Sequence, residues 1–387
     1  MRAWKAAVGV VLVTVCAAVG RAEDSTVLDS PVVGEEAAAP SRVTPEPLEA
    51  NWVAGVDRGL EVQFGTSRVS LHGYAWLRAD SQTTVGDETD LKATIPVGRL
   101  FSTGELLDSK LGFFAQFEFA GDQPELLDLF AEWHFSEAAT LRLGQFRTPY
   151  SRAFITPLTN LALPTRGLVI DRFSLGRDTG AMLSGGLAAG LLHYDLAVVN
   201  GAEINDLDEN RDSPSVIART ELRFGDPIPY DQSPSLHITD GRGLTVGLGG
   251  AYSRRSIDGA SGTTSETLSN GAVDVAVLLG GLSVRAEGFW RGAHGSPRVA
   301  NAFGAYGQLG VFVLPRQLEV GGRVGWLSDG PDVQTYEAFM AGYLMQGERA
   351  YGHHAKLILG YRYDSSDPGR GSGRDIHLAR LQLQLFF

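Results

Sequence analysis

Short segments that alternate apolar with polar or small side chains recur along this chain from about residue 60 to its end. In residues 380–387, three leucines at alternate positions and the terminal Phe387 face one way, while an arginine and two glutamines face the other. A period of two residues indicates a β-strand, because successive side chains of a strand point to opposite faces. The recurring pattern therefore predicts an all-β protein whose strands each carry one apolar face.

Composition argues against the helical alternatives. Glycine accounts for 48 of the 387 residues, which is too many for a helical protein, because each glycine costs about 1 kcal/mol relative to alanine in a helix interior. The mean hydropathy is -0.04, and no apolar run long enough for a spanning helix follows the N-terminal segment, which excludes an α-helical membrane protein. A soluble β-sandwich and a transmembrane β-barrel remain, and they differ in whether the apolar face forms a core or contacts lipid.

The number of strands and their aromatic residues favour the transmembrane barrel. The predicted strands centre near residues 74, 96, 115, 131, 143, 182, 195, 220, 248, 274, 286, 306, 322, 341, 358 and 381. They number sixteen, and bacterial barrels have an even number of strands. Aromatic side chains near strand ends, such as Trp133, Trp290 and Trp326, suit the girdles at the two membrane interfaces. We therefore expect a transmembrane antiparallel β-barrel of about sixteen strands.

The connections between these strands alternate in length, as expected for short periplasmic turns and longer extracellular loops. The third extracellular loop, residues 148–176, is nearly thirty residues long, and a long stretch without a strand in a compact protein is usually functional. We expect this loop to fold inward into the barrel. Residues 226–242, with three prolines, are long for a periplasmic turn. Two explanations stay open: this turn carries extra structure, or one pair of strands is miscounted.

The N-terminal sequence has the order of a signal peptide. In residues 1–22, a basic start is followed by an apolar stretch and by small residues that permit cleavage after Ala22. Residues 23–58, rich in Pro, Ala, Ser and Glu, are expected to form a flexible periplasmic leader, and residues 59–387 the outer-membrane barrel. The only cysteine, Cys16, lies in the signal segment, so the exported part is expected to hold no disulfide.

The charge of the long loop is opposite to that of the rest of the chain. The whole chain carries -12, and loss of the three basic residues of the signal segment makes the exported part -15. Residues 142–178 hold six arginines and two aspartates, a net charge of +4. The six arginines are Arg142, Arg147, Arg152, Arg166, Arg172 and Arg177. Because a guanidinium is permanently charged and matches phosphate and carboxylate oxygens, we expect these six to line an anion path.

The inward faces of the predicted strands supply charges of both signs. The expected arginines of the lumen wall include Arg219, Arg223, Arg285, Arg323, Arg362 and Arg380. The expected carboxylates are Glu118, Asp128, Glu132, Asp195, Glu221, Asp274, Glu287 and Glu319. One alternative for the loop arginines therefore stays open: they pair with Asp171, Asp178 and wall carboxylates, or contact lipopolysaccharide phosphates.

Two motifs carry a family resemblance. The segments Leu141–Arg152 and Gly176–Met182 resemble the phosphate-selective porin O/P family, and the resemblance extends from about residue 60 to the end. It implies a sixteen-stranded outer-membrane barrel, a homotrimer and a basic, inward-folded third loop, with which some members select phosphate or polyphosphate. It also implies that Arg147, Arg152 and Arg177 occupy motif positions in the anion path.

The expected function is a passive diffusion channel for small anions in the bacterial outer membrane, with phosphate and polyphosphate as candidate solutes. The expected partners are the membrane's lipid and lipopolysaccharide, and the barrel-assembly machinery through the C-terminal Phe387. The alternatives are a general porin without selectivity, or a β-protein that acts as an adhesin or enzyme. Eight scattered histidines without an HExxH or GxSxG motif disfavour an enzyme, so no cofactor or metal site is expected. The acidic net charge disfavours nucleic acid as a partner.

Overall fold

A computed structural model of the chain describes residues 50–55, 59–201, 204–205, 214–259, 262–295, 301–330, 332–345, 354–366 and 375–387. These residues belong to one compact unit, Leu48–Phe387. The predicted signal peptide and residues 23–49 of the predicted leader lie outside the described residues.

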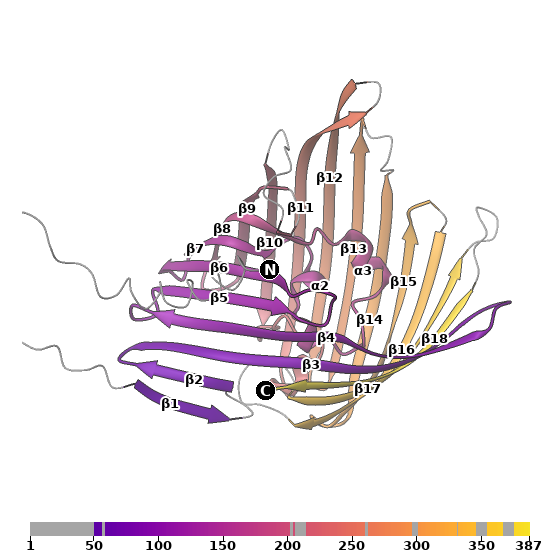
Figure 1. Ribbon diagram of the computed structural model, residues 1–387, viewed down its shortest axis with the longest axis horizontal. Helices are drawn as coiled ribbons and strands as arrows, with labels where there is room; N and C mark the ends of the chain where they lie inside the picture. Colours follow the sequence, from indigo (N-terminus) through magenta and orange to yellow (C-terminus); the bar gives the residue numbers. More distant parts are fainter. Residues whose placement is uncertain are drawn as a thin grey trace, which may run out of the picture. The chain divides into compact units, whose positions relative to one another are not determined.

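Sixteen antiparallel strands form a closed barrel (Figure 1). They are β3 (Ser67–Thr84), β4 (Thr89–Leu106), β5 (Leu111–Glu118), β6 (Glu125–Ser136), β7 (Ala139–Arg147), β8 (Arg177–Leu187), β9 (Leu192–Val199), β10 (Ser215–Gly225), β11 (Arg242–Gly259), β12 (Gly262–Leu279), β13 (Leu282–His294), β14 (Ala302–Leu314), β15 (Leu318–Ser328), β16 (Asp332–Met345), β17 (Ala355–Ser366) and β18 (Ile376–Phe386). Each strand pairs with the next, and β18 pairs with β3, which closes the ring. Each predicted centre lies within one of these strands, so the predicted fold class and strand number are confirmed.

A hairpin that the sequence pattern did not predict precedes the barrel. Strand β1 (Ala50–Gly55) pairs with β2 (Gly59–Phe64), and β2 pairs with the start of β3. The flexible leader predicted for residues 23–58 therefore does not extend over residues 50–55, which form a strand. The physical reason is the free edge of β2, whose backbone N–H and C=O groups need hydrogen-bond partners.

The two faces of the barrel wall differ in polarity in the way that a membrane requires. Large apolar side chains are exposed on the outer face, for example Leu248 at 58% and Leu309 at 51%. On the inner face, charged side chains such as Arg219 and Glu221 are only 1% exposed. In a soluble protein the apolar face would be the buried one, whereas a transmembrane barrel turns it toward lipid.

The short helices of the structure belong to connections between strands. Helix α2 (Arg152–Ile155), the 3-10 helix η1 (Leu158–Asn160) and helix α3 (Leu168–Phe173) lie between β7 and β8. The 3-10 helix η2 (Pro234–Leu236) lies between β10 and β11. Among the described residues, none of the helices has the length and apolar character needed to cross a membrane.

Candidate functional site in the barrel lumen

Loop 148–176 owes its shape to a few residues with clear local roles. Ser151 caps helix α2, since its hydroxyl accepts a hydrogen bond from the backbone N–H of Phe154 at 3.3 Å. Pro157 follows the helix and prevents its continuation. Gly167, with a φ of 99°, precedes α3 in a conformation that residues with a Cβ rarely adopt. The loop therefore has a defined conformation that its own residues stabilise.

Side chains of several strands donate hydrogen bonds to the backbone of the loop. Arg78 of β3 donates to the carbonyl of Pro164 at 3.1 Å, and Arg323 of β15 donates to the carbonyl of Thr165 at 3.2 Å. Lys356 of β17 donates to the carbonyl of Leu161 at 2.5 Å. These three strands lie on one arc of the ring, β15 to β3. Arg152 of the loop also contacts Glu221 of β10, on another arc, so the loop lies inside the barrel.

The start of α2 is held by a buried cluster of opposite charges. The Arg152 guanidinium contacts Glu221 at 3.0 Å, and Arg219 contacts both Glu221 at 2.8 Å and Asp274 at 2.7 Å. Glu287 accepts hydrogen bonds from the backbone N–H groups of Arg152, at 2.9 Å, and of Ala153. Apolar packing completes this anchor, since Tyr150, Phe146 and Phe289 belong to one buried cluster. Arg152 therefore fastens the loop to the wall.

The connection between β10 and β11 also enters the barrel. Its backbone N–H at Gln232 donates to the carbonyl of Asn160 at 2.8 Å, and the Gln232 side chain accepts from the N–H of Ala162 at 3.0 Å. Ser233 and Tyr343 donate to the carboxylate of Glu319 at 2.5 and 2.6 Å. The long turn predicted at residues 226–242 therefore carries extra structure, and the strand number was not miscounted.

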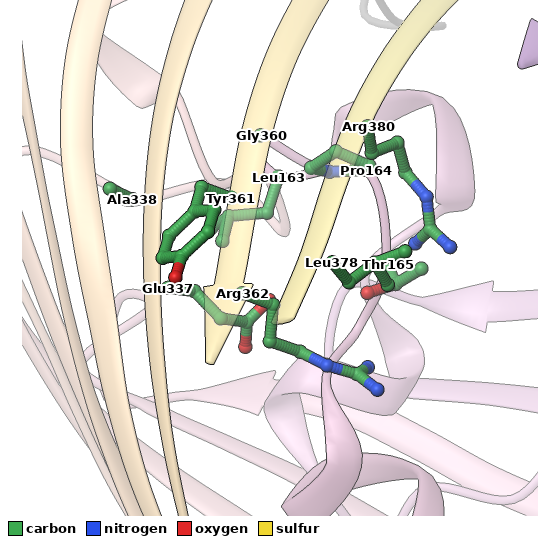
Figure 2. A pocket seen from close by; sticks show the side chains of 10 residues that line it. All are labelled: Leu163, Pro164, Thr165, Glu337, Ala338, Gly360, Tyr361, Arg362, Leu378 and Arg380. Atoms are coloured by element: carbon green, nitrogen blue, oxygen red, sulfur yellow. The ribbon is translucent and has the colours of Figure 1, made fainter. Parts of the chain in front are cut away.

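Beside β16, β17 and β18 the loop packs closely against the wall. Figure 2 shows Arg380 and Thr165 on the same side of these strands, beside Pro164 and Leu163 of the loop. The cavity among them measures about 10 Å³, which is about the minimum needed for one water molecule.

The opposite side of the lumen is accessible to solvent. Side-chain exposure is 21% for Glu132, 24% for Arg142, 23% for His193 and 30% for Arg223, on β6, β7, β9 and β10. By contrast, Lys356 and Glu319 are fully buried. A solvent-accessible part of the lumen therefore adjoins one end of these strands, and Arg362 of β17 is exposed to a similar extent, at 25%.

Most of the predicted arginines are neutralised. Nine of the twelve form an ion pair with a carboxylate: Arg142 with Glu132, Arg152, Arg219 and Arg223 with Glu221, Arg172 with Asp329, Arg177 with Asp128, Arg323 with Glu337, Arg362 with Asp364, and Arg380 with Asp80. The sequence pattern identified several of these carboxylates as inward-facing but missed Asp80, Asp329 and Glu337. It also missed Arg78 and Arg99, whose alternating positions on β3 and β4 were the available signal.

Three predicted arginines have no carboxylate partner among the described residues: Arg147, Arg166 and Arg285. Arg147 donates to the carbonyls of Ile155 at 3.1 Å and Thr156 at 3.3 Å. Arg166 donates to the carbonyls of Phe154 and of the same Thr156. Burial, and then the charge of Arg147, lower the pKa of the Arg166 guanidinium. Two like charges therefore meet at the carbonyl end of helix α2.

The family of this chain follows from its sequence. A family model described as phosphate-selective porin O and P matches residues 74–363. This chain belongs to that family. The porin matches no curated protein sequence.

Solved structures of other porins share its fold. The anion-selective porin from Comamonas acidovorans has a TM-score of 0.60 at 12% identity, over 83% of this porin and 100% of that chain. The outer membrane channel DcaP of Acinetobacter baumannii has a TM-score of 0.58 at 12% identity, over 82% and 97%. OprB of Pseudomonas putida has a TM-score of 0.60 at 9% identity, over 82% and 94%. Family and fold together make this protein a porin channel of the bacterial outer membrane.

Proposed function

We propose that this porin passes small anions, phosphate among them, by passive diffusion between loop 148–176 and strands β6–β10. Arg147 and Arg166 supply the selecting charge. The observation that carries this proposal is that both donate to the carbonyl of Thr156 while neither has a carboxylate partner among the described residues. Neutralised pairs such as Arg142 with Glu132 contribute little net field, so the unpaired charges determine the sign of the selectivity.

The size of the effect follows from Coulomb's law. At an effective dielectric constant of about 20, a unit charge roughly 8 Å away changes the energy of a monovalent ion by about 2 kcal/mol, favourably for an anion and unfavourably for a cation. Arg166 is only 8% exposed, so its charge acts on a passing anion through space rather than through a direct contact. The name of the Comamonas acidovorans porin, anion-selective, agrees with this proposal.

The test is the reversal potential of single channels in a KCl gradient. The unaltered channel is expected to prefer chloride, and the double variant Arg147→Gln/Arg166→Gln to lose most of that preference. The matched control is Arg142→Gln/Glu132→Gln, which removes a pore-facing ion pair without changing the net charge. The control should keep the chloride preference of the unaltered channel.

The alternatives predict different results. A reversal potential near zero in the unaltered channel indicates a general porin, and a cation preference contradicts the proposal. Phosphate is then added to a chloride solution, and a reduced chloride current is expected if phosphate occupies the path. Hydrolysis of a lipid or ester substrate above background would contradict a function as a channel alone.

We also propose that the porin forms a homotrimer. Strands β5 and β9 have eight residues each, slightly fewer than the about 9–11 residues that a tilted transmembrane strand needs. We propose that neighbouring subunits cover the wall at these two short strands. Light scattering of the detergent-solubilised porin, corrected for bound detergent, should give three times the mass of one chain.

A further inference from the structure

A second cavity lies beyond the constriction, where loop 148–176 joins the ends of β7 and β8. Its volume is about 630 Å³, within the range of roughly 300–1,000 Å³ that is usual for small-molecule sites. Its apolar lining includes Leu127, Phe154, Leu175, Val199, Ile217 and Leu268. We call this cavity the vestibule.

The apolar lining is unexpected for a water-filled lumen, whose inward-facing positions are usually polar. Val199 and Ile217 occupy inward positions of β9 and β10. Each of these two residues is 2% exposed, so they form a packed apolar base beneath the cavity. Leu175 and Leu268 are half-buried and line the same cavity. A solute in the vestibule would therefore meet apolar carbon surface as well as water.

The cations of the vestibule are not equivalent. Arg177 pairs with Asp128 at 3.0 Å, and Arg172 pairs with Asp329. Arg291 donates to the backbone carbonyl of Arg172 at 2.7 Å and lies 5.2 Å from the centre of the Phe173 ring. The charge of Asp329 acts on Arg291 from a distance, but among the described residues no carboxylate forms an ion pair with Arg291, so the guanidinium can still bind an anionic solute.

The vestibule also holds two acidic residues. Asp178 accepts hydrogen bonds from the backbone N–H groups of Thr179 at 2.8 Å and Gly201 at 2.7 Å, so its carboxylate oxygens already have donors. Glu125 is exposed at the beginning of β6. The cation at Arg291 and the apolar surface near it therefore remain the features that a ligand could use.

We propose that the vestibule binds organic monoanions with a compact apolar body, the carboxylate at Arg291 and the body against Leu175 and Leu268. This inference rests on the proposed anion channel and names a solute class for it. An inorganic anion would interact only with the positive charge of Arg291. An anion with an apolar body would also remove apolar surface from water, which adds to its binding.

The experiment compares three probes as blockers of chloride current: cyclohexanecarboxylate, acetate and cyclohexanecarboxamide. Cyclohexanecarboxylate is expected to give half-block at a concentration at least tenfold below that of acetate, and the neutral amide to block weakly. Arg291→Gln should weaken both carboxylates, whereas Leu175→Ser should weaken only cyclohexanecarboxylate. The proposal would be overturned if the two carboxylates gave half-block at the same concentration. It would also be overturned if the tenfold preference for cyclohexanecarboxylate over acetate were unchanged in both Arg291→Gln and Leu175→Ser.

The same recordings separate this inference from the proposed function. If the vestibule binds no organic anion, the reversal potential in KCl still shows chloride preference and only the preference between the carboxylates disappears. If the anion channel itself is wrong, the reversal potential shows no chloride preference. Leu268→Asn is a second variant of the apolar wall, for use if Leu175→Ser does not fold, and it should reduce the preference for cyclohexanecarboxylate in the same way.

Discussion

The backbone N–H of Gln232 donates to the carbonyl of Asn160 at 2.8 Å inside the barrel. Gln232 belongs to the connection between β10 and β11, whereas Asn160 belongs to loop 148–176, which joins β7 and β8 at the other end of the barrel. The two connections therefore meet in the lumen. Their contact fixes the position of this part of the loop. Because the loop borders the proposed path, the contact also affects the width of that path.

Replacing the Gln232 side chain should loosen this contact. In Gln232→Ala, the N–H of Ala162 loses its acceptor at a site where Gln232 is only 2% exposed, a cost of about 1–3 kcal/mol. We expect a noisier open-channel current and a lower melting temperature, with the chloride preference unchanged. The control is Gln82→Ala, at an exposed glutamine of β3. Equal current noise in the two variants would contradict the role of Gln232.

The ion pair of Arg152 and Glu221 should stabilise the folded loop. Arg152→Met leaves Glu221 with Arg219 and Arg223 but removes a buried contact at 3.0 Å, and breaking a buried pair costs about 3–5 kcal/mol. We expect a lower melting temperature and a larger single-channel conductance, because the loop detaches from the wall. The double variant Arg152→Met/Glu221→Gln should lose less stability than the sum of the losses in the two single variants. Strict additivity would argue against the pairing.

Gly144 should not tolerate a side chain. Its φ is +129°, and a Cβ at this position would collide with the backbone carbonyl of Leu129 on the neighbouring strand. We expect Gly144→Ala to reduce the yield of folded barrel, measured by heat-modifiable migration in detergent gels. Gly186→Ala is the matched control, since its Cβ would come no closer than 3.8 Å to Glu137. Normal folding of both variants would contradict this prediction.

The inserted turn should become less stable as pH rises. A hydrogen bond from His237 to Asp231, at 3.2 Å, raises the pKa of His237, while burial and Arg316 oppose this shift. A raised pKa in the folded state means that the stabilisation is complete below the unfolded pKa of about 6.5 and is lost as pH passes through the folded value. Urea unfolding between about pH 5 and 9 should show this loss, and His237→Gln should reduce it. An identical pH profile in the variant would exclude His237 as the cause.

Alternation along the chain was enough to predict the strands, and their even number and aromatic ends favoured the barrel. The predicted centre of each of the sixteen strands lies within the observed strand. This succeeded because the alternation of apolar and polar side chains along a strand is a local property of the sequence. The leader was less predictable. Residues 50–55 carry no long alternating pattern, and their strand depends on pairing with β2, which is a contact between segments.

The candidate site could be predicted less well than the fold, because it depends more on tertiary contacts. The sequence placed Arg147, Arg152 and Arg177 in one basic stretch, yet Arg152 pairs with Glu221 and Arg177 with Asp128. Within the part of the chain that the structure describes, Arg147 bonds to backbone carbonyls and to no carboxylate. The sequence by itself therefore determined the strands, their two faces and the net charge of the loop, because these depend on local composition and periodicity. Only the tertiary structure decided which charges remain unpaired, because an ion pair requires side chains far apart in the chain to come within about 4 Å.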